Sequence, residues 1–210
     1  EISKMILSAE DLSYSYGDRL LFENITFNVE EGDKYGIIGV NGTGKSTLLR
    51  AISGIWPFVD GKIFLPERDK LMFIPQKSYL PLGTLRAALN YPGNKPIDDT
   101  ELIYLMDLCQ IGYLKDKLDL EADWSHVLSV GEQQRLAFVR AHIQQPQWLF
   151  LDEATSALDE DTEATMYSLL QERLQQTTVV SVGHRSTLNK YHELVLRLNK
   201  STRQVTLEKL

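Results

Sequence analysis

Hydrophobic and polar residues alternate strictly early in the chain. Ile25, Phe27 and Val29 are apolar, while the intervening Thr26 and Asn28 are polar. A period of two places successive side chains on opposite faces of an extended backbone. The alternation predicts a half-buried strand of an antiparallel sheet, and the first thirty residues as a whole are expected to form such strands.

Three later segments are apolar without alternation. They are the runs KYGIIGV at 34–40, WLFLD at 148–152 and TVVSVG at 178–183. Short runs that are apolar on both faces are typical of a parallel sheet covered by helices. Two further short strands are expected near the end of the chain, at 194–198 and 204–210.

Helical spacing appears directly after the first of these runs. Apolar residues recur there at i, i+3, i+4 and i+7, which places them on one face of an α-helix. These residues are Leu48, Ala51, Ile52 and Ile55. A second helix is expected between the last two runs, and its apolar residues are Met166, Leu170 and Leu174.

Residues 76–146 have a different sequence pattern, which predicts a mostly helical part of the chain. One helix is expected to begin with a capping box formed by Asp98 and Glu101, and another is expected over 129–143. The Pro/Gly-rich stretch NYPGNKP at 90–96 is expected to connect the rest of the chain to this helical part.

Composition narrows the class of protein. The 210 residues carry a net charge of −7, from 22 basic and 29 acidic residues, which argues against a nucleic-acid-binding surface. The sequence contains no run of about 18 apolar residues that could span a bilayer and no signal peptide. Because it begins with Glu1 rather than methionine, we expect a piece of a longer polypeptide. The single cysteine, Cys109, lies at helical spacing among apolar residues, which favours a buried thiol in a reducing compartment.

A glycine-rich stretch, GVNGTGKST at 39–47, separates the first apolar run from the helix that follows. It fits the phosphate-loop pattern G-x-x-x-x-G-K-[ST], whose glycines let backbone N–H groups converge on an anion at the positive end of a helix. Lys45 is expected to neutralise the β- and γ-phosphates of a nucleoside triphosphate, and the Ser46 hydroxyl to bind Mg²⁺. The residues of this stretch expected to contact the triphosphate are Gly39, Asn41, Gly42, Thr43, Gly44, Lys45, Ser46 and Thr47.

Two adjacent carboxylates, Asp152 and Glu153, end the second apolar run. They fall at the carboxyl edge of the expected parallel sheet, where ligand sites of α/β proteins lie. Asp152 is expected to hold Mg²⁺ through water, and Glu153 to polarise an attacking water. The sequence therefore predicts an α/β fold: a phosphate-loop NTPase core with a mostly parallel sheet, a small antiparallel β subdomain and an inserted helical subdomain. The expected limits are 1–75 and 147–210 for the core with its β subdomain and 76–146 for the helical subdomain, within one nucleotide-binding domain over 1–210.

The stretch LSVGEQQR at 128–135 opens another helix and exposes a second set of helix N-terminal N–H groups. Ser129 and Glu132 also form a capping box, so a purely structural role is the alternative. The stretch resembles the signature motif of the ATP-binding cassette (ABC) ATPases, usually LSGGQ, from which Val130 and Glu132 depart. The resemblance implies that Ser129, Gly131 and Glu132 cap the γ-phosphate held by a second ATP-binding domain, in a homodimer with the nucleotides between its subunits.

Other motifs of this family follow in the expected order. Gln76 in FIPQKS resembles the Q-loop glutamine that touches Mg²⁺ and the lytic water, Asp159 in SALD resembles the D-loop aspartate, and His184 in SVGHR resembles the switch histidine. The resemblance gives Gln76, His184 and Glu153 catalytic roles. Tyr16 matches the position that stacks on adenine, with Tyr14 as the alternative.

The exact residues in and around these motifs are typical of a transporter. DEATSALDE at 152–160 looks like transport-type cassettes rather than soluble translation factors. The stretches at 54–57, 73–92 and 181–193 are similar to peroxisomal fatty-acyl (subfamily D) transporters and to bacterial relatives that fuse a permease to one cassette and move peptides or cobalamin. This resemblance implies ATP hydrolysis that powers a transmembrane permease domain, either upstream in the same chain or in a separate subunit, without a nucleic-acid partner.

The resemblance also implies membrane association on the cytoplasmic face, at a bacterial inner membrane or, alternatively, an organellar one. Two other functions are the alternatives. A soluble ABC-type ATPase acting on ribosomes or DNA would carry a second cassette or a coiled-coil insertion. It would also have different residues directly after Asp152. A metabolic kinase with a phosphate loop would not need Ser129 and Gly131.

Overall fold

The computed structural model describes residues 6–39, 42–56, 59–93 and 95–210, and the chain forms two compact units. The first unit comprises Glu1–Phe73, Pro146–Glu153 and Gln176–Leu210. The second comprises Ile74–Gln145 and Ala154–Gln175. The domain limits expected from the sequence stay a prediction.

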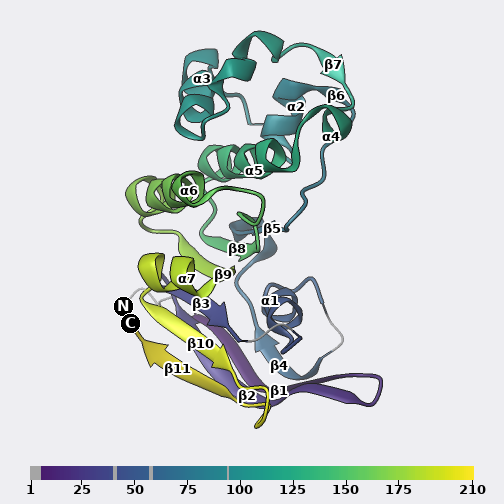
Figure 1. Cartoon of the computed structure of the whole chain (residues 1–210), viewed down its shortest axis with the longest axis vertical. Helices are drawn as coiled ribbons and strands as arrows, with labels where there is room; N and C mark the ends of the chain where they lie inside the picture. Colours follow the sequence, from purple (N-terminus) through teal and green to yellow (C-terminus); the bar gives the residue numbers. More distant parts are fainter. Residues whose placement is uncertain (1–5, 40–41, 57–58, 94) are drawn as a thin grey trace. The chain divides into compact units, whose positions relative to one another are not determined.

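A small antiparallel sheet lies in the first unit, with the strand order β2-β1-β4 (Figure 1). Its strands are β1 (Ile6–Tyr16), β2 (Arg19–Glu30) and β4 (Asp60–Phe64). Along β2 the three apolar residues of the alternating segment are buried, whereas Thr26 and Asn28 are exposed. The predicted antiparallel strand is therefore confirmed.

A larger sheet has the strand order β11-β10-β3-β9-β8-β5 (Figure 1). Its strands are β3 (Lys34–Ile38), β5 (Leu71–Ile74), β8 (Trp148–Asp152), β9 (Thr178–Val182), β10 (Leu194–Leu198) and β11 (Val205–Lys209). β3 pairs in parallel with β9 and β10, and β8 pairs in parallel with β9, whereas β11 runs antiparallel to β10. Every residue of β8 and β9 is buried, as their unbroken apolar runs predict. The two sheets confirm the predicted α/β class.

The helix after β3, α1 (Lys45–Ile52), is shorter than its apolar spacing predicts. The three earlier residues of the pattern are buried, but Ile55 lies beyond the helix and is 52% exposed, so that part of the prediction is wrong. The reason is Gly54, whose φ of 81° is left-handed. A glycine in this conformation ends a helix, and here the Ile55 N–H turns back to the carbonyl of Arg50.

The second unit is mostly helical, as the sequence predicts. Its α-helices are α2 (Leu85–Asn90), α3 (Asp99–Leu108), α4 (Trp124–Val127), α5 (Val130–Gln144) and α6 (Glu160–Arg173). It also contains the 3-10 helix η2 (Gly112–Lys117) and the short paired strands β6 (Gly83–Thr84) and β7 (Glu121–Ala122). The first unit contains two further helical segments, η1 (Arg68–Lys70) and α7 (Arg185–Tyr191).

Two predictions about the second unit are wrong in detail. Asp98 caps α3, but its carboxylate accepts a hydrogen bond from the Thr100 N–H and not, as a capping box requires, from the N–H of Glu101. A short side chain at the N-cap can reach either of these two N–H groups. The stretch 90–96, of which residue 94 lies outside the described residues, leads from α2 toward α3. It is not the entry to the helical part, because the chain already enters the second unit at Ile74.

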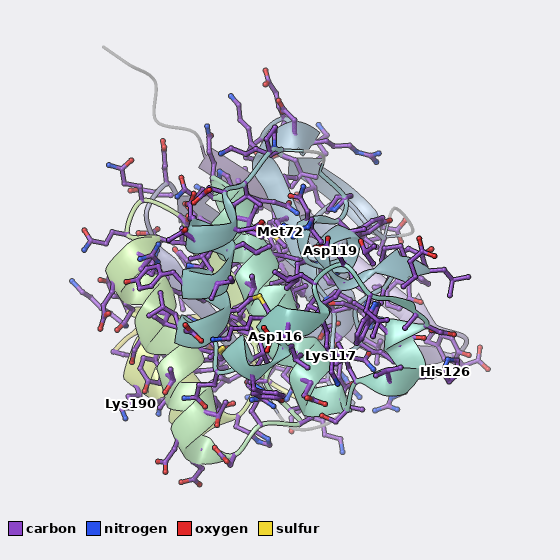
Figure 2. The ribbon with its side chains drawn as sticks, turned by 90° about the horizontal axis from the view of Figure 1, so that it is seen from above. Met72, Asp116, Lys117, Asp119, His126 and Lys190 are labelled. Carbon is purple, nitrogen blue, oxygen red and sulfur yellow. The ribbon has the colours of Figure 1, made fainter. Side chains whose placement is uncertain are left out.

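Several ionisable side chains are buried. Cys109 is fully buried, as predicted, and burial raises the pKa of its thiol to about 12. His142 on α5 and His192 after α7 are 3% and 5% exposed, and burial lowers the pKa of each to about 4. His126 on α4, by contrast, points outward (Figure 2). The folded chain therefore holds two imidazoles uncharged at neutral pH.

We expect the free energy of unfolding to fall as the pH is lowered from 7 to 5. The unfolded chain, whose histidines have pKa values near 6.5, binds protons in this window, whereas the folded chain resists them until the pH nears about 4. Each buried histidine then removes about 2 kcal/mol of stability. Urea unfolding at both pH values should show a smaller pH difference for His142→Leu than for the wild type. The surface variant His126→Leu should change that difference much less, and an unchanged difference in H142L would contradict the prediction.

Candidate active site

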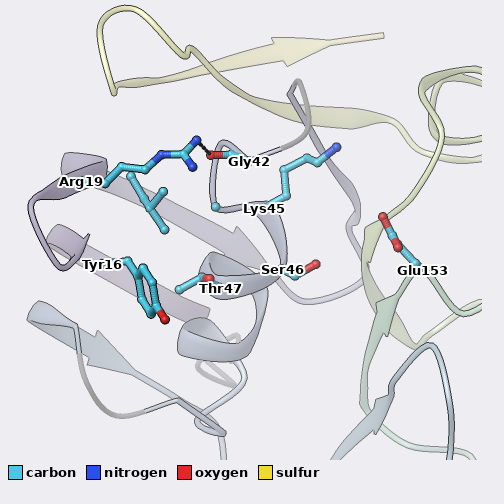
Figure 3. A pocket seen from close by; sticks show the side chains of 9 residues that line it. Tyr16, Arg19, Gly42, Lys45, Ser46, Thr47 and Glu153 are labelled. Carbon is cyan, nitrogen blue, oxygen red and sulfur yellow. Dashed lines mark hydrogen bonds between the residues drawn. The ribbon is translucent and has the colours of Figure 1, made fainter.

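A cavity of about 330 Å³ opens around the segment that joins β3 to α1 in the first unit (Figure 3). The residues that line it are Tyr16, Arg19, Leu21, Gly42, Gly44, Lys45, Ser46, Thr47 and Glu153. Most of them are residues that the sequence predicts to contact a nucleotide. Lys45, Ser46 and Glu153 point toward the same open space, although Glu153 is more than one hundred residues away in the sequence.

The backbone of the joining segment needs glycine at several positions. Gly42 and Gly44 have φ values of 80° and 89°, in the left-handed region that side chains disfavour. A Cβ on Gly39 would lie 2.7 Å from the hydroxyl oxygen of Thr43, which is itself buried. The Lys45 ammonium donates a hydrogen bond of 2.8 Å to the Gly39 carbonyl. Gly39 thus holds the lysine side chain at the start of α1, where helix N–H groups attract anions.

Asp152 anchors this helix to the sheet. Its buried carboxylate accepts a hydrogen bond of 2.7 Å from the Ser46 hydroxyl and another of 3.1 Å from the Arg50 guanidinium, both of which belong to α1. Glu153 follows in a left-handed conformation, with φ of 51°, and its N–H donates to the Val182 carbonyl at 2.8 Å. A non-glycine residue in this region is uncommon and is held there by its surroundings.

The Ser46–Asp152 pair fits a magnesium ion. Hydroxyl and carboxylate oxygens are the protein ligands that Mg²⁺ prefers, and it usually completes its shell with waters and substrate phosphates. Within the described ranges, no group of three or more His, Cys, Asp or Glu side chains is arranged to hold a metal by protein ligands alone. A metal at this pair would therefore need phosphate or water oxygens as additional ligands.

The two candidate adenine-stacking tyrosines differ in environment. Tyr16 is 74% exposed and lines the cavity. Tyr14 instead packs against Phe22 and Trp56, with ring centroids 6.1 and 6.2 Å away. The structure therefore favours Tyr16 as the residue with a free aromatic face.

The structure does not test two other residues that the sequence predicts to belong to the site. His184 is the exposed N-cap residue of α7 and is not among the described residues that line the cavity. Asn41 lies outside the described residues. Their predicted roles stay predictions.

The signature stretch of the second unit begins α5 with a complete capping box. The Ser129 hydroxyl accepts from the Glu132 N–H at 3.1 Å, while the Glu132 carboxylate accepts from the Ser129 N–H at 2.9 Å and from the Tyr113 hydroxyl. Burial alone would raise the pKa of Glu132, but these hydrogen bonds outweigh it and lower the pKa. At Gly131 a Cβ would lie 3.2 Å from the Ala157 carbonyl, so little space is left for a side chain.

Gln76 and Asp159 also belong to the second unit. The Gln76 amide donates to the Ser156 hydroxyl at 3.1 Å, and its backbone carbonyl accepts from the Gln134 amide at 2.9 Å. Asp159 is the N-cap of α6, and hydrogen bonds from Thr162 lower its pKa. The structure thus joins the stretches around Gln76, Gln134 and Ser156 into one hydrogen-bonded cluster within this unit.

Comparison with known proteins identifies the family. The sequence model of the family described as ABC transporter matches residues 22–156, which is more than half of the chain. The chain belongs to this family. The phosphate loop, the acidic end of β8 and the signature stretch are therefore parts of an ATP-binding ATPase domain, and the resemblance inferred from the motifs is confirmed.

Relatives of this ABC domain include two kinds of transporter protein. It is 45% identical over 85% of its length to an uncharacterized ABC transporter ATP-binding protein of Haemophilus influenzae, of which it covers 30%. It is 38% identical over 86% of its length to ATP-binding cassette sub-family D member 3 of Mus musculus, of which it covers 28%. A bacterial Atm1-family ABC exporter with ATP bound matches 98% of the chain with a TM-score of 0.83 and 25% identity, and the chain covers 39% of that protein.

The ABC domain thus spans less than a third of these sequence relatives. In the described part of the chain, no helix is both long and apolar enough to cross a membrane.

Sequence reasoning missed two basic residues of the site. Arg19, at the start of β2, lines the cavity and donates to the Gly42 carbonyl at 2.9 Å. Arg50 pairs with Asp152. Neither arginine belongs to a motif of chemistry-bearing residues, so only the three-dimensional contacts reveal them.

We expect Lys45→Ala to weaken the binding of Mg-ATP by roughly 10- to 100-fold, because hydrogen bonds to charged groups contribute about 1.5–3 kcal/mol. Isothermal titration calorimetry of the purified domain measures this affinity. Lys62→Ala, which removes an exposed lysine from β4, is the matched control and should bind ATP like the wild type. Near-wild-type affinity in K45A would contradict the assignment of the phosphate loop.

Proposed function

We propose that this ABC domain binds Mg-ATP in the cavity and hydrolyses it as a head-to-tail homodimer that powers a membrane permease domain. The observation that carries the proposal is the convergence of Lys45, Ser46 and Glu153 on one cavity, next to the buried Asp152. The cavity thus combines the cation of Lys45, the metal-binding hydroxyl of Ser46 and a base, Glu153, at the end of a parallel strand.

Within one subunit, the phosphate loop from Gly39 to Thr47 would hold the triphosphate and Tyr16 would stack on the adenine. The buried carboxylate of Asp152 and the Ser46 hydroxyl would hold Mg²⁺, and the family resemblance adds Gln76 as a proposed ligand. The metal would neutralise charge on the β- and γ-phosphate oxygens. In the described structure Lys45 already holds its ammonium at the loop, tied to a carbonyl that a phosphate oxygen can replace.

Glu153 is the proposed general base. Its side chain lines the cavity, and its left-handed backbone turns it out of the buried strand β8 toward that space. Gln76 and His184 are proposed to complete the catalytic group by positioning the lytic water and contacting the γ-phosphate. Neither of them needs to be in the cavity lining of an isolated subunit for this role, since catalytic contacts often form only in the assembled complex.

A second subunit is proposed because the chain has two sets of anion-binding groups. Ser129, Gly131 and Glu132 lie at the start of α5, and a helix start attracts anions. A two-fold axis would place this helix start, together with Asp159, over the γ-phosphate bound by the partner, and would form both sites at once.

The partner in transport is proposed to be a transmembrane permease domain, either upstream in the same polypeptide or in a separate subunit. The support is the similarity to transporter proteins of which this domain covers less than a third. The domain would then lie at the cytoplasmic face of a membrane, and the acidic net charge of −7 supports a partner other than nucleic acid. The bacterial relatives favour a bacterial inner membrane.

The variant Glu153→Gln tests the proposed mechanism. Glutamine keeps the size and one carbonyl of glutamate but cannot accept a proton, so we expect ATP hydrolysis to fall by 100-fold or more while binding persists. Trapped Mg-ATP should then hold two subunits together, because a ligand that favours the dimer shifts the equilibrium toward it. Size-exclusion chromatography with light scattering, with and without Mg-ATP, reports the dimer.

The control is Glu31→Gln, which removes an exposed glutamate of the same unit and should hydrolyse ATP like the wild type. An E153Q protein that binds ATP tightly yet remains monomeric would refute the head-to-tail dimer. Hydrolysis at the wild-type rate would remove Glu153 as the base.

A further inference from the structure

Arg19 holds a fixed place at the nucleotide cavity. The register of the β1–β2 hairpin pairs it directly with Tyr16, across a tight turn that contains Gly17 with φ of 59°. Both side chains line the cavity. The hairpin therefore presents an aromatic ring and a guanidinium group to the same space, a few ångströms apart along neighbouring strands.

The guanidinium group reaches the phosphate loop itself. Its Nη2 donates a hydrogen bond of 2.9 Å to the carbonyl of Gly42, and in the view of Figure 3 Arg19 and Lys45 lie on either side of that residue. The Gly42 backbone is left-handed and a Cβ there would lie 2.9 Å from the same nitrogen, so the approach depends on glycine. Arg19 thus contacts the part of the loop that surrounds the expected triphosphate.

The hydrogen bond to Gly42 uses only one of the N–H donors of the Arg19 guanidinium group. Guanidinium carries five N–H donors in a planar fork, and a neutral carbonyl is a weaker acceptor for it than a phosphate. Among the residues that the structure describes, no carboxylate forms an ion pair with Arg19. The cavity lining contains two basic side chains, Arg19 and Lys45, against one acidic side chain, Glu153, within a protein of net charge −7.

We propose that Arg19 is a phosphate-binding residue that selects nucleoside triphosphates by leaving the Gly42 carbonyl and bonding the phosphate chain. The inference rests on the proposed binding of ATP in this cavity. With adenine stacked on Tyr16, the guanidinium from the next strand would approach the phosphates from the side of the loop opposite Lys45. The nucleotide would then lie between two cations, and its affinity for the site would grow with the number of phosphates.

A second explanation of the same contact is a tether, in which Arg19 only holds the loop in shape through the Gly42 carbonyl. The two explanations differ in whether the positive charge matters. Arg19→Gln keeps an N–H donor for the carbonyl but removes the charge, whereas Arg19→Lys keeps both. Arg68→Gln, which changes an exposed arginine of η1 in the same unit, is the matched control.

The test is isothermal titration of the purified domain and its three variants with AMP, ADP and ATP in the presence of Mg²⁺. We expect R19Q to bind ATP about tenfold more weakly than the wild type, ADP less affected, and AMP changed by less than about twofold. R19K should keep most of the ATP affinity. The ATP affinity of R19Q should also depend less on salt concentration, because one charged contact is gone.

Wild-type ATP affinity in R19Q, or an equal loss for AMP and ATP, would overturn phosphate binding by Arg19 in favour of the tether. That result leaves the proposed function intact provided that the wild type binds ATP and that Lys45→Ala binds it more weakly. If the wild type binds none of the three nucleotides, both the proposed function and the role of Arg19 are overturned.

Discussion

The hydrogen bond from the Ser46 hydroxyl to the buried Asp152 carboxylate is the contact on which the site depends. An ionised carboxylate that is only 4% exposed is costly unless it is paired and hydrogen-bonded. Its oxygens bond to Ser46 and Arg50, which both come from α1. Any shift of α1 relative to β8 would leave this charge without partners. Because the phosphate loop ends where α1 begins, the same bond that satisfies Asp152 also fixes the loop over the cavity.

The loop holds its shape through contacts that a nucleotide can replace. Lys45 donates to the Gly39 carbonyl and Arg19 to the Gly42 carbonyl, so two cations are kept at the loop by neutral acceptors. A phosphate oxygen is a stronger acceptor than a carbonyl, which makes the exchange favourable, while the left-handed backbone at Gly42 and Gly44 stays as it is. Preorganised donors of this kind reduce the reorganisation that binding requires. Under the proposed function, the domain would meet ATP with its cations already in place.

Local patterns in the sequence predicted most of the elements, and contacts between distant residues account for what they missed. Strands that are buried on both faces have unbroken apolar runs, and a strand buried on one face, such as β2, alternates. The sequence therefore predicts both kinds of strand directly. Ile55 was misplaced because Gly54 stops α1 one turn before the apolar spacing does. Asp98 was assigned the wrong partner because two N–H groups lie within its reach. Arg19 and Arg50 carry no local signal: each acts on a residue at least 23 positions away, through a fold that the sequence does not display.

The signature stretch forms a complete capping box with glutamate at position 132, where the family motif usually has glutamine. In the capping box the Ser129 hydroxyl accepts from the Glu132 N–H, which leaves its own O–H proton free to be donated. The Glu132 carboxylate accepts from the Ser129 N–H and from Tyr113, so its negative charge is held by two donors at the start of α5. A glutamine at 132 could accept the same Ser129 bond through its side-chain carbonyl. In the proposed dimer, glutamate therefore preserves the cap that orients the serine, and the bonds to Ser129 and Tyr113 reduce the repulsion between its charge and a phosphate.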